Sequence, residues 1–154
     1  MSIERQLEST YDLDSFKKVI LNIMYTGSWV NEKVAEFFKV YDLTSQQFNI
    51  LRILRGQKGK PLNLQDVQTR MISRMSNTTR LIEKLRLKEL VTRVQCESNR
   101  RKIEIKITQN GLDLLKEIDK TISEHESNMT RNLSQEDAHI LNELLNKLRK
   151  NQIE

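Results

Sequence analysis

Glycine and proline are scarce in this chain, and their scarcity limits its possible folds more than any other feature. The 154 residues include four glycines and one proline, roughly 3% of the chain where average usage would give about 12%. Sandwiches, barrels and propellers need many tight turns, which these two residues usually form. We therefore expect one mainly helical domain with few connections, which also suits a chain of this length.

The other residue types indicate what the core is made of and where the protein works. Aromatic residues form only 5% of the chain, so the core must depend on leucine, isoleucine, valine and methionine. A single cysteine allows no intramolecular disulfide, which suits a reducing compartment. No apolar run approaches the roughly 18 residues of a membrane span, and the first residues lack the apolar stretch of a secretory signal. We therefore expect a cytoplasmic protein.

The first long periodic segment predicts one helix from about Asp14 to Tyr41. Its apolar residues recur at alternating spacings of four and three, a heptad-like stripe with one small member. They are Phe16, Ile20, Ile23, Gly27, Val30, Val34, Phe37 and Tyr41. A helix of about 28 residues is roughly 42 Å long, which is longer than a small core needs. Part of this stripe should therefore be buried against something beyond its own domain.

Capping signals divide the next part of the chain into shorter helices. Thr44 and Gln47 form a capping-box pattern that predicts a helix, and a surface loop follows at residues 56–61. Asn63 is suited to cap a short helix. A turn then leads to a further helix that ends at about residue 89. Two serines are candidates for its N-cap: Ser73 and Ser76.

The periodicity changes from helical to alternating at one place in the sequence. Two alternating runs flank a polar stretch and predict a β-hairpin. Their members are Thr92, Val94, Cys96, Ile103, Ile105 and Ile107. Two helices follow, one capped by Thr108 and one opened by Ser134 with Asp137. The order short helix, turn, helix and hairpin is that of a winged helix-turn-helix, in a fold that is mainly α, or α+β by strict count.

The positive charge of the chain is concentrated in this helix and hairpin. The whole chain carries a net +5, whereas residues 74–106 contain ten basic and four acidic residues and carry +6. A helix of this diameter fits the major groove of DNA, and a basic hairpin can reach the backbone or the minor groove. The candidate DNA-binding residues of the helix are Arg74, Ser76, Asn77, Thr79, Arg80 and Lys84, and those of the hairpin are Asn99, Arg100, Arg101 and Lys102.

Several short motifs in this region resemble the MarR family of transcription regulators. They are Leu43-Thr44, Gln47-Phe48, Lys60-Pro61-Leu62, Thr79-Arg80-Leu81-Ile82-Glu83-Lys84-Leu85, Leu90-Val91-Thr92-Arg93, Asn99-Arg100-Arg101-Lys102 and Ile107-Thr108-Gln109-Asn110-Gly111-Leu112. They occur in the family's order and spacing, and the resemblance covers nearly the whole chain. It implies one MarR-type domain over residues 1–154, with a DNA-binding lobe at 44–108 and dimerisation helices at 12–41 and 109–150.

The resemblance also implies a function and a partner. Members of the family are homodimers that bind pseudo-palindromic double-stranded DNA as repressors or activators, and a small phenolic or aromatic ligand commonly releases them; of the two roles, we expect repression here. Arg101 matches an arginine of the family's β-hairpin, called the wing, that enters the minor groove. Asn99 stands where the family usually has an aspartate that orients this arginine, and Thr78 stands where the family is usually apolar.

Other functions have weaker support in the sequence. We interpret His125 and His139 as ordinary polar residues on the surface of the C-terminal helices. We therefore expect no enzyme, no metal site and no cofactor. Cys96 is either an inert strand residue or a redox sensor. Four apolar residues are candidates for a ligand pocket, although each is first of all a core residue: Met24, Trp29, Phe37 and Phe48. The alternative function is a winged-helix module that binds protein, without an effector or sequence-specific DNA binding.

Overall fold

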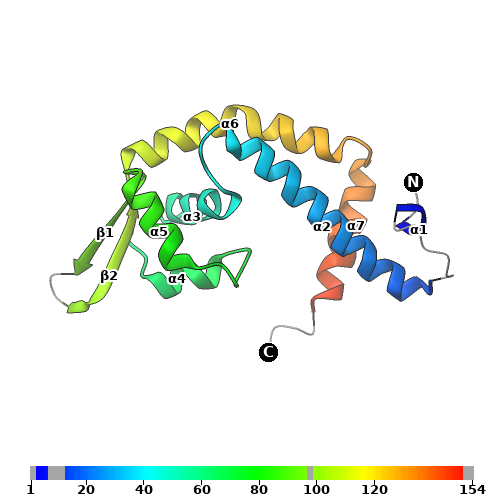
Figure 1. Cartoon of the computed structure of the whole chain (residues 1–154), viewed down its shortest axis with the longest axis horizontal. Helices are drawn as coiled ribbons and strands as arrows, with labels where there is room; N and C mark the ends of the chain where they lie inside the picture. The colour runs from blue at the N-terminus through cyan, green and yellow to red at the C-terminus, as the bar shows by residue number, and fades with distance from the viewer. Residues whose placement is uncertain (1–2, 7–12, 97–98, 151–154) are drawn as a thin grey trace. The chain divides into compact units, whose positions relative to one another are not determined.

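The computed structural model describes residues 3–6, 13–96 and 99–150, with the backbone alone for residues 4, 96 and 99–102. The elements in chain order are α1 (Ile3–Gln6), α2 (Ser15–Lys39), α3 (Ser45–Arg55), α4 (Leu64–Arg70), α5 (Thr78–Leu87), β1 (Val91–Cys96), β2 (Asn99–Ile107), α6 (Gln109–Thr130) and α7 (Gln135–Leu148) (Figure 1). The predicted mainly helical fold with one hairpin is confirmed. The chain forms two compact units, and the boundary between residues 116 and 117 lies within α6.

Most helices begin where the sequence predicts. The side chain of Asp14 accepts the backbone N–H groups of Phe16 and Lys17 and caps α2. The capping box of Thr44 with Gln47 opens α3, and that of Ser134 with Asp137 opens α7. These reciprocal bonds satisfy N–H groups that the first turn of a helix leaves without partners. The short α1 has no counterpart in the prediction; it contacts α2, and its Ile3 is buried.

The start of α5 differs from the prediction. Its N-cap is Asn77, whose side-chain oxygen accepts the backbone N–H of Arg80 at 3.0 Å, and neither Ser73 nor Ser76 caps it. The helix also ends at Leu87, two residues earlier than expected. Glu89 then adopts a left-handed conformation with φ of 58°, a geometry that stops a helix and is usually adopted by glycine.

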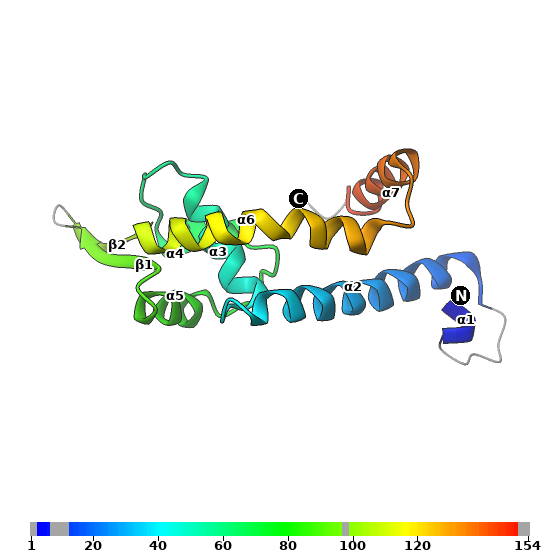
Figure 2. The same cartoon turned by 90° about the horizontal axis from the view of Figure 1, so that it is seen from above.

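The first unit has one apolar core, formed by α3, α4, α5 and the hairpin. Its fully buried side chains include Ile50, Leu51, Leu54, Val67, Ile82, Leu85, Val91 and Ile105. Leu62, just before α4, exchanges two backbone hydrogen bonds with Ile105 and forms an isolated antiparallel β-bridge beside the hairpin. Figure 2 shows α3, α4 and α5 grouped together, with the hairpin extending from one end of the group.

The hairpin confirms one of the two predicted alternating runs. In β2, Ile105 is buried, and Ile103 and Ile107 are half-buried. In β1, Val91 is buried, whereas Thr92 and Val94 from the other predicted run are exposed. The strands pair antiparallel, and their register shifts between Gln95 and Cys96. The strand therefore packs on the core only at the end nearest α5.

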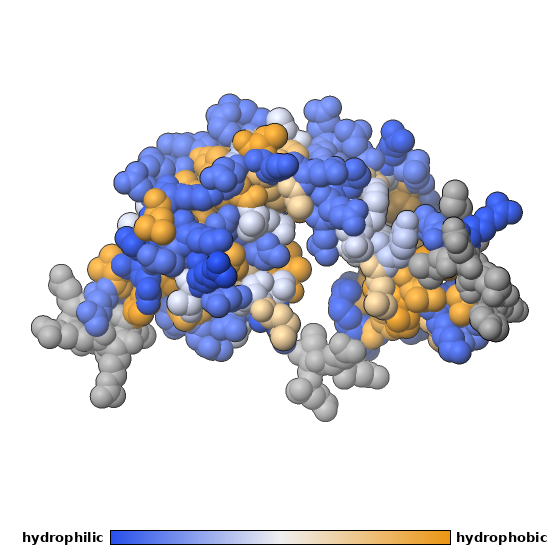
Figure 3. Space-filling view, viewed as in Figure 1, coloured by the Kyte–Doolittle hydropathy of each residue, from blue (hydrophilic) through white to orange (hydrophobic). Residues whose placement is uncertain are grey.

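Two helices expose apolar side chains that the chain itself does not cover. On α2, Phe16 is 86% exposed and Ile20 is 52% exposed, and apolar surface gathers where this helix begins (Figure 3). In the second unit, α7 has no buried residue and exposes Ile140, Leu141, Leu144 and Leu148. No helix in the described part of the chain is both long enough and apolar enough to cross a membrane.

Candidate nucleic-acid interface

The second helix of the helix-turn-helix, α5, has an inner and an outer side. Thr78, Ile82 and Leu85 are buried, whereas Arg80 lies on the opposite side of the helix and is exposed. Thr78 occupies an inward position despite its hydroxyl, because that hydroxyl donates to the carbonyl of Ser76 at 3.4 Å. Thr79 and Lys84, which the sequence also singled out, are exposed on α5.

The turn between α4 and α5 is fixed by hydrogen bonds from both sides. The side-chain oxygen of Asn49 on α3 accepts the backbone N–H of Ile72 at 2.9 Å. Within the turn, the N–H of Ser76 donates to the carbonyl of Ser73 at 3.2 Å. Arg74 is exposed and Ser76 is half-buried. The turn is therefore a firm support for the side chains that precede α5.

The charge around the turn and the start of α5 has one sign. Residues 67–82 contain three arginines, Arg70, Arg74 and Arg80, and no acidic residue. All three are exposed. The amino end of a helix adds a partial positive charge to such a surface. The arrangement suits a phosphate-rich partner, and each phosphate that these cations neutralise would make binding depend more steeply on salt.

The first acidic residue of α5, Glu83, is engaged by its own helix. Arg86 donates three hydrogen bonds to the Glu83 carboxylate, the shortest at 2.7 Å. These bonds hold the pKa of Glu83 below its ordinary range and raise that of Arg86. Arg86 thus reduces the repulsion that the Glu83 carboxylate would exert on nearby phosphates.

The carboxyl end of α5 is tied to the turn that follows α2. The Lys88 ammonium donates to the carboxylate of Asp42 at 2.7 Å and also to the backbone carbonyl of Asp42. Asp42 has a positive φ of 51°. This ion pair holds the carboxyl end of α5, and the Asn49 bond holds the start of the turn that precedes the helix.

The wing carries predictions that stay open. The backbone of Asn99, Arg100, Arg101 and Lys102 lies in β2, and their side chains are outside the described part of the structure, as is that of Cys96. The described flanks of the hairpin expose Arg93 and Lys106. The roles of the wing residues in binding therefore remain predictions.

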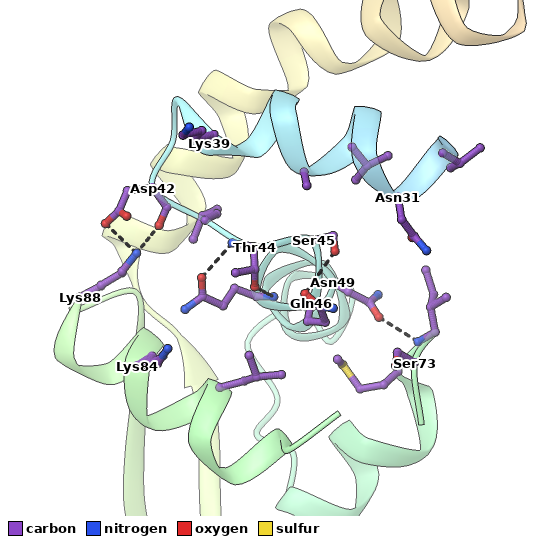
Figure 4. Close-up of a pocket in the computed structure, with 18 of the residues that line it drawn as sticks. Asn31, Lys39, Asp42, Thr44, Ser45, Gln46, Asn49, Ser73, Lys84 and Lys88 are labelled. Carbon is purple, nitrogen blue, oxygen red and sulfur yellow. Dashed lines mark hydrogen bonds and ion pairs between the residues drawn. The ribbon is translucent and has the colours of Figure 1, made fainter. Parts of the chain in front are cut away.

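An open pocket of about 1170 Å³ lies between the end of α2, the start of α3, the α4–α5 turn and α5 (Figure 4). Its apolar lining includes Val30, Val34 and Leu81. Lys39, Asp42, Lys84 and Lys88 are the charged residues that line it. Apolar walls with a few charged groups suit a small amphipathic molecule.

The four predicted ligand residues are not brought together at this pocket. Met24 and Trp29 lie on the exposed part of α2, and neither lines the pocket. Phe37 is half-buried, with its ring 5.1 Å from that of Phe38. Phe48 is buried against Phe38, and Arg52 lies over its ring. The pocket residues escaped prediction because they come from distant parts of the sequence.

No cluster of three or more metal-ligating side chains occurs within the described ranges. His139 pairs with Glu143 at 3.5 Å on the surface of α7. Three residues of the interface were absent from the predicted set: Arg70 and Met75 are exposed around the turn, and Asn49 holds it. The acid-free stretch of basic residues could have revealed Arg70, whereas Asn49 is recognisable only from the fold.

Comparisons with known proteins agree with this architecture. The family model described as "MarR family" matches residues 43–103. A MarR transcription factor from Planctomyces limnophilus is 27% identical, covering 88% of this chain and 97% of that one with a TM-score of 0.69. A mutant of MarR from E. coli in complex with operator DNA is 20% identical to this chain. The match covers 88% of this chain and 99% of the MarR chain, with a TM-score of 0.76. The organohalide-sensing regulator RdhR, bound to 2,4-dichlorophenol, is 16% identical to this chain. The match covers 94% of this chain and 83% of the RdhR chain, with a TM-score of 0.82.

Proposed function

The chain belongs to the MarR family of transcription regulators, and from that premise we propose that it is a cytoplasmic homodimeric repressor of a pseudo-palindromic operator. It is a DNA-binding regulator and not an enzyme. The observation that carries the proposal is the exposed start of α5, where three arginines surround a firmly held turn without any acidic residue. In our proposal, α5 enters the major groove and the wing contacts the backbone or the minor groove.

Two exposed apolar faces support the homodimer. Phe16, Ile20 and Met24 on α2 are each at least half exposed, and α7 exposes Leu144 and Leu148 to a similar degree. Contiguous apolar surface of this kind marks an interaction site. A second copy of the chain is the partner that two-fold symmetric operators require, because each half-site then receives an identical lobe.

Regulation by a small ligand is supported by the pocket beside α5. Its walls come from α2, α3, the α4–α5 turn and α5, so an occupant would touch both the long helix and the helix proposed to read DNA. A chlorinated phenol is bound in the RdhR structure. We place the effector of this protein, an aromatic or phenolic molecule, in this pocket rather than at the four residues selected from the sequence.

Selection of bound duplexes from a random pool tests the function directly. The expected result is a two-fold symmetric consensus with half-site centres one helical turn apart, about 10 base pairs. Binding with equal affinity to selected and random duplexes at physiological salt would contradict the proposal. That outcome would favour the alternative, a winged-helix module that binds protein.

A further inference from the structure

Met75 is a large apolar side chain on a surface where most of the neighbouring residues are polar or basic. It is 96% exposed, whereas Met71, four residues earlier, is 4% exposed and belongs to the core. Its neighbours in the turn are Ser73, Arg74 and Ser76. A single exposed apolar residue needs no explanation on an arbitrary surface. This one lies two residues before the N-cap of α5, within the surface proposed to face DNA.

The backbone that carries Met75 is held in place before any partner binds. The Asn49 side chain accepts the N–H of Ile72, and the N–H of Ser76 donates to the carbonyl of Ser73. Asn77 then begins α5 through its bond to the N–H of Arg80. Little conformational freedom of the backbone is therefore lost when this turn meets a partner, which favours binding through its side chains.

The major groove offers one apolar group to such a side chain. Among the base edges exposed there, only thymine presents a methyl group, and the other groups are hydrogen-bond donors and acceptors. Residues at the amino end of a recognition helix are those that reach base edges. The methionine thioether is flexible and polarizable, so it can follow an irregular apolar surface.

We propose that Met75 contacts a thymine methyl group in each operator half-site and thereby makes this position of the sequence selective for thymine. The inference rests on the proposed function, since it requires α5 to enter the major groove. Ile72 is similarly exposed, at 86%, but it lines the pocket beside α5 and has no part in the inference. Burial of one methyl group corresponds to about a fourfold change in affinity, and two half-sites to roughly fifteenfold.

Replacing thymine by deoxyuridine tests this contact, because the substitution removes only the methyl group. The probe is the duplex selected from the random pool, with each symmetric pair of thymines replaced in turn. Wild-type protein should lose affinity by roughly fifteenfold at one pair. Met75→Ala should bind the thymine and deoxyuridine duplexes equally at that pair, and Met75→Leu should restore most of the difference.

A matched control separates this contact from a general loss of apolar surface. Val40, at the end of α2, is 81% exposed and does not line the pocket, and Val40→Ala should retain the full deoxyuridine effect. An equal deoxyuridine effect in wild type and Met75→Ala would overturn the inference, as would the absence of any effect in wild type. In either case a symmetric consensus would leave the proposed function standing. Failure to select any duplex would overturn both.

Discussion

Asn77 caps α5, and in the proposed function it also contacts a base, so one substitution to alanine would remove both roles. Its side-chain oxygen caps α5 by accepting the N–H of Arg80, and its amide is available to an adenine edge in the major groove. Asn77→Ala should therefore lose about 1 kcal/mol of stability from the missing cap as well as sequence preference. Asn77→Ser keeps an N-cap and should lose the preference alone. Thermal unfolding and binding to selected and random duplexes measure the two effects.

Arg80 and the wing cations should behave differently from each other in the same assay. Arg80 lies on the outward side of α5, so Arg80→Ala should weaken the selected duplex by about 1–3 kcal/mol and leave random duplex less affected. Arg101→Ala and Lys102→Ala should weaken both duplexes alike. Equal losses on selected and random DNA from Arg80→Ala would contradict the role given to α5.

Gly111 is required by the close approach of α6 to the strand that precedes it. A Cβ atom at this position would lie 2.4 Å from the carbonyl oxygen of Leu90 and 2.7 Å from a side-chain carbon of Ile107. Gly111→Ala should lower the free energy of unfolding by about 3 kcal/mol, because backbone must shift to admit the methyl group. The control is Gly56→Ala, whose Cβ would be no closer than 3.4 Å to its neighbours. That variant should change stability by less than about 0.5 kcal/mol.

At the scale of single elements, α5 carries an exposed ion pair between Glu83 and Arg86. The hydrogen bonds from Arg86 lower the pKa of Glu83 from its ordinary value of 4.5. A lowered carboxyl pKa means that the pair stabilises the fold above pH 4.5 and that this contribution is lost as the pH falls through the folded value. In Arg86→Ala, the pKa of Glu83 should return toward 4.5, as measured by NMR titration, and DNA affinity at neutral pH should fall. An unchanged pKa would show that the pair is absent in solution.

The exposed face of α7 gives a prediction for assembly. Leu144 is 58% exposed in the single chain, so a charge there has little effect on the isolated subunit and a large one in an apolar interface. Leu144→Glu should convert a dimer of twice 18.2 kDa into a monomer by light scattering. Val40→Glu places the same charge at another exposed apolar position and should leave the dimer intact. A wild-type mass that stays at one subunit at every concentration would refute the dimer.

Short-range signals explain how much of the fold could be read from the sequence. The capping boxes of Thr44 and Ser134 were predictable because both partners lie within one helical turn. The cap of α5 was not, because Ser73, Ser76 and Asn77 are all good caps and tertiary contacts decide between them. Which residue of β1 faces the core also depends on tertiary contacts, since Val91, next to α5, is the buried one among Val91–Gln95.

The candidate site also has a part that could be predicted from short segments and a part that depends on the tertiary fold. The basic and polar residues of α5 were predictable, because charge and helical spacing are properties of a short segment. The pocket was not, because its walls come from helices that are far apart in the sequence. Its lysines, such as Lys39 and Lys84, resemble any exposed lysine until the fold places them in the lining of one pocket with Val30 and Leu81.

For the molecule as a whole, the distribution of charge along the chain determines its affinity for DNA more than the total charge does. Residues 74–106 carry more positive charge than the whole chain, so the remaining helices have no net attraction for phosphate. Two chains should therefore bind DNA only through their paired helices and wings, with an affinity that falls steeply with salt. Each phosphate contact removed by Lys102→Ala should reduce the slope of log K against log salt by about 0.9. A slope unaffected by this variant would show that the wing does not contact the backbone.

The hydrogen bond between Asn49 and Ile72 links two surfaces of the molecule with different tasks. The Asn49 amide lines the pocket, and its oxygen holds the turn from which α5 begins (Figure 4). A ligand that replaced the Ile72 N–H as the donor to this oxygen would free the backbone of the turn. Ligand binding in the pocket and DNA binding by α5 would then be coupled through a single acceptor atom. This coupling would require no conformational change in the rest of the protein.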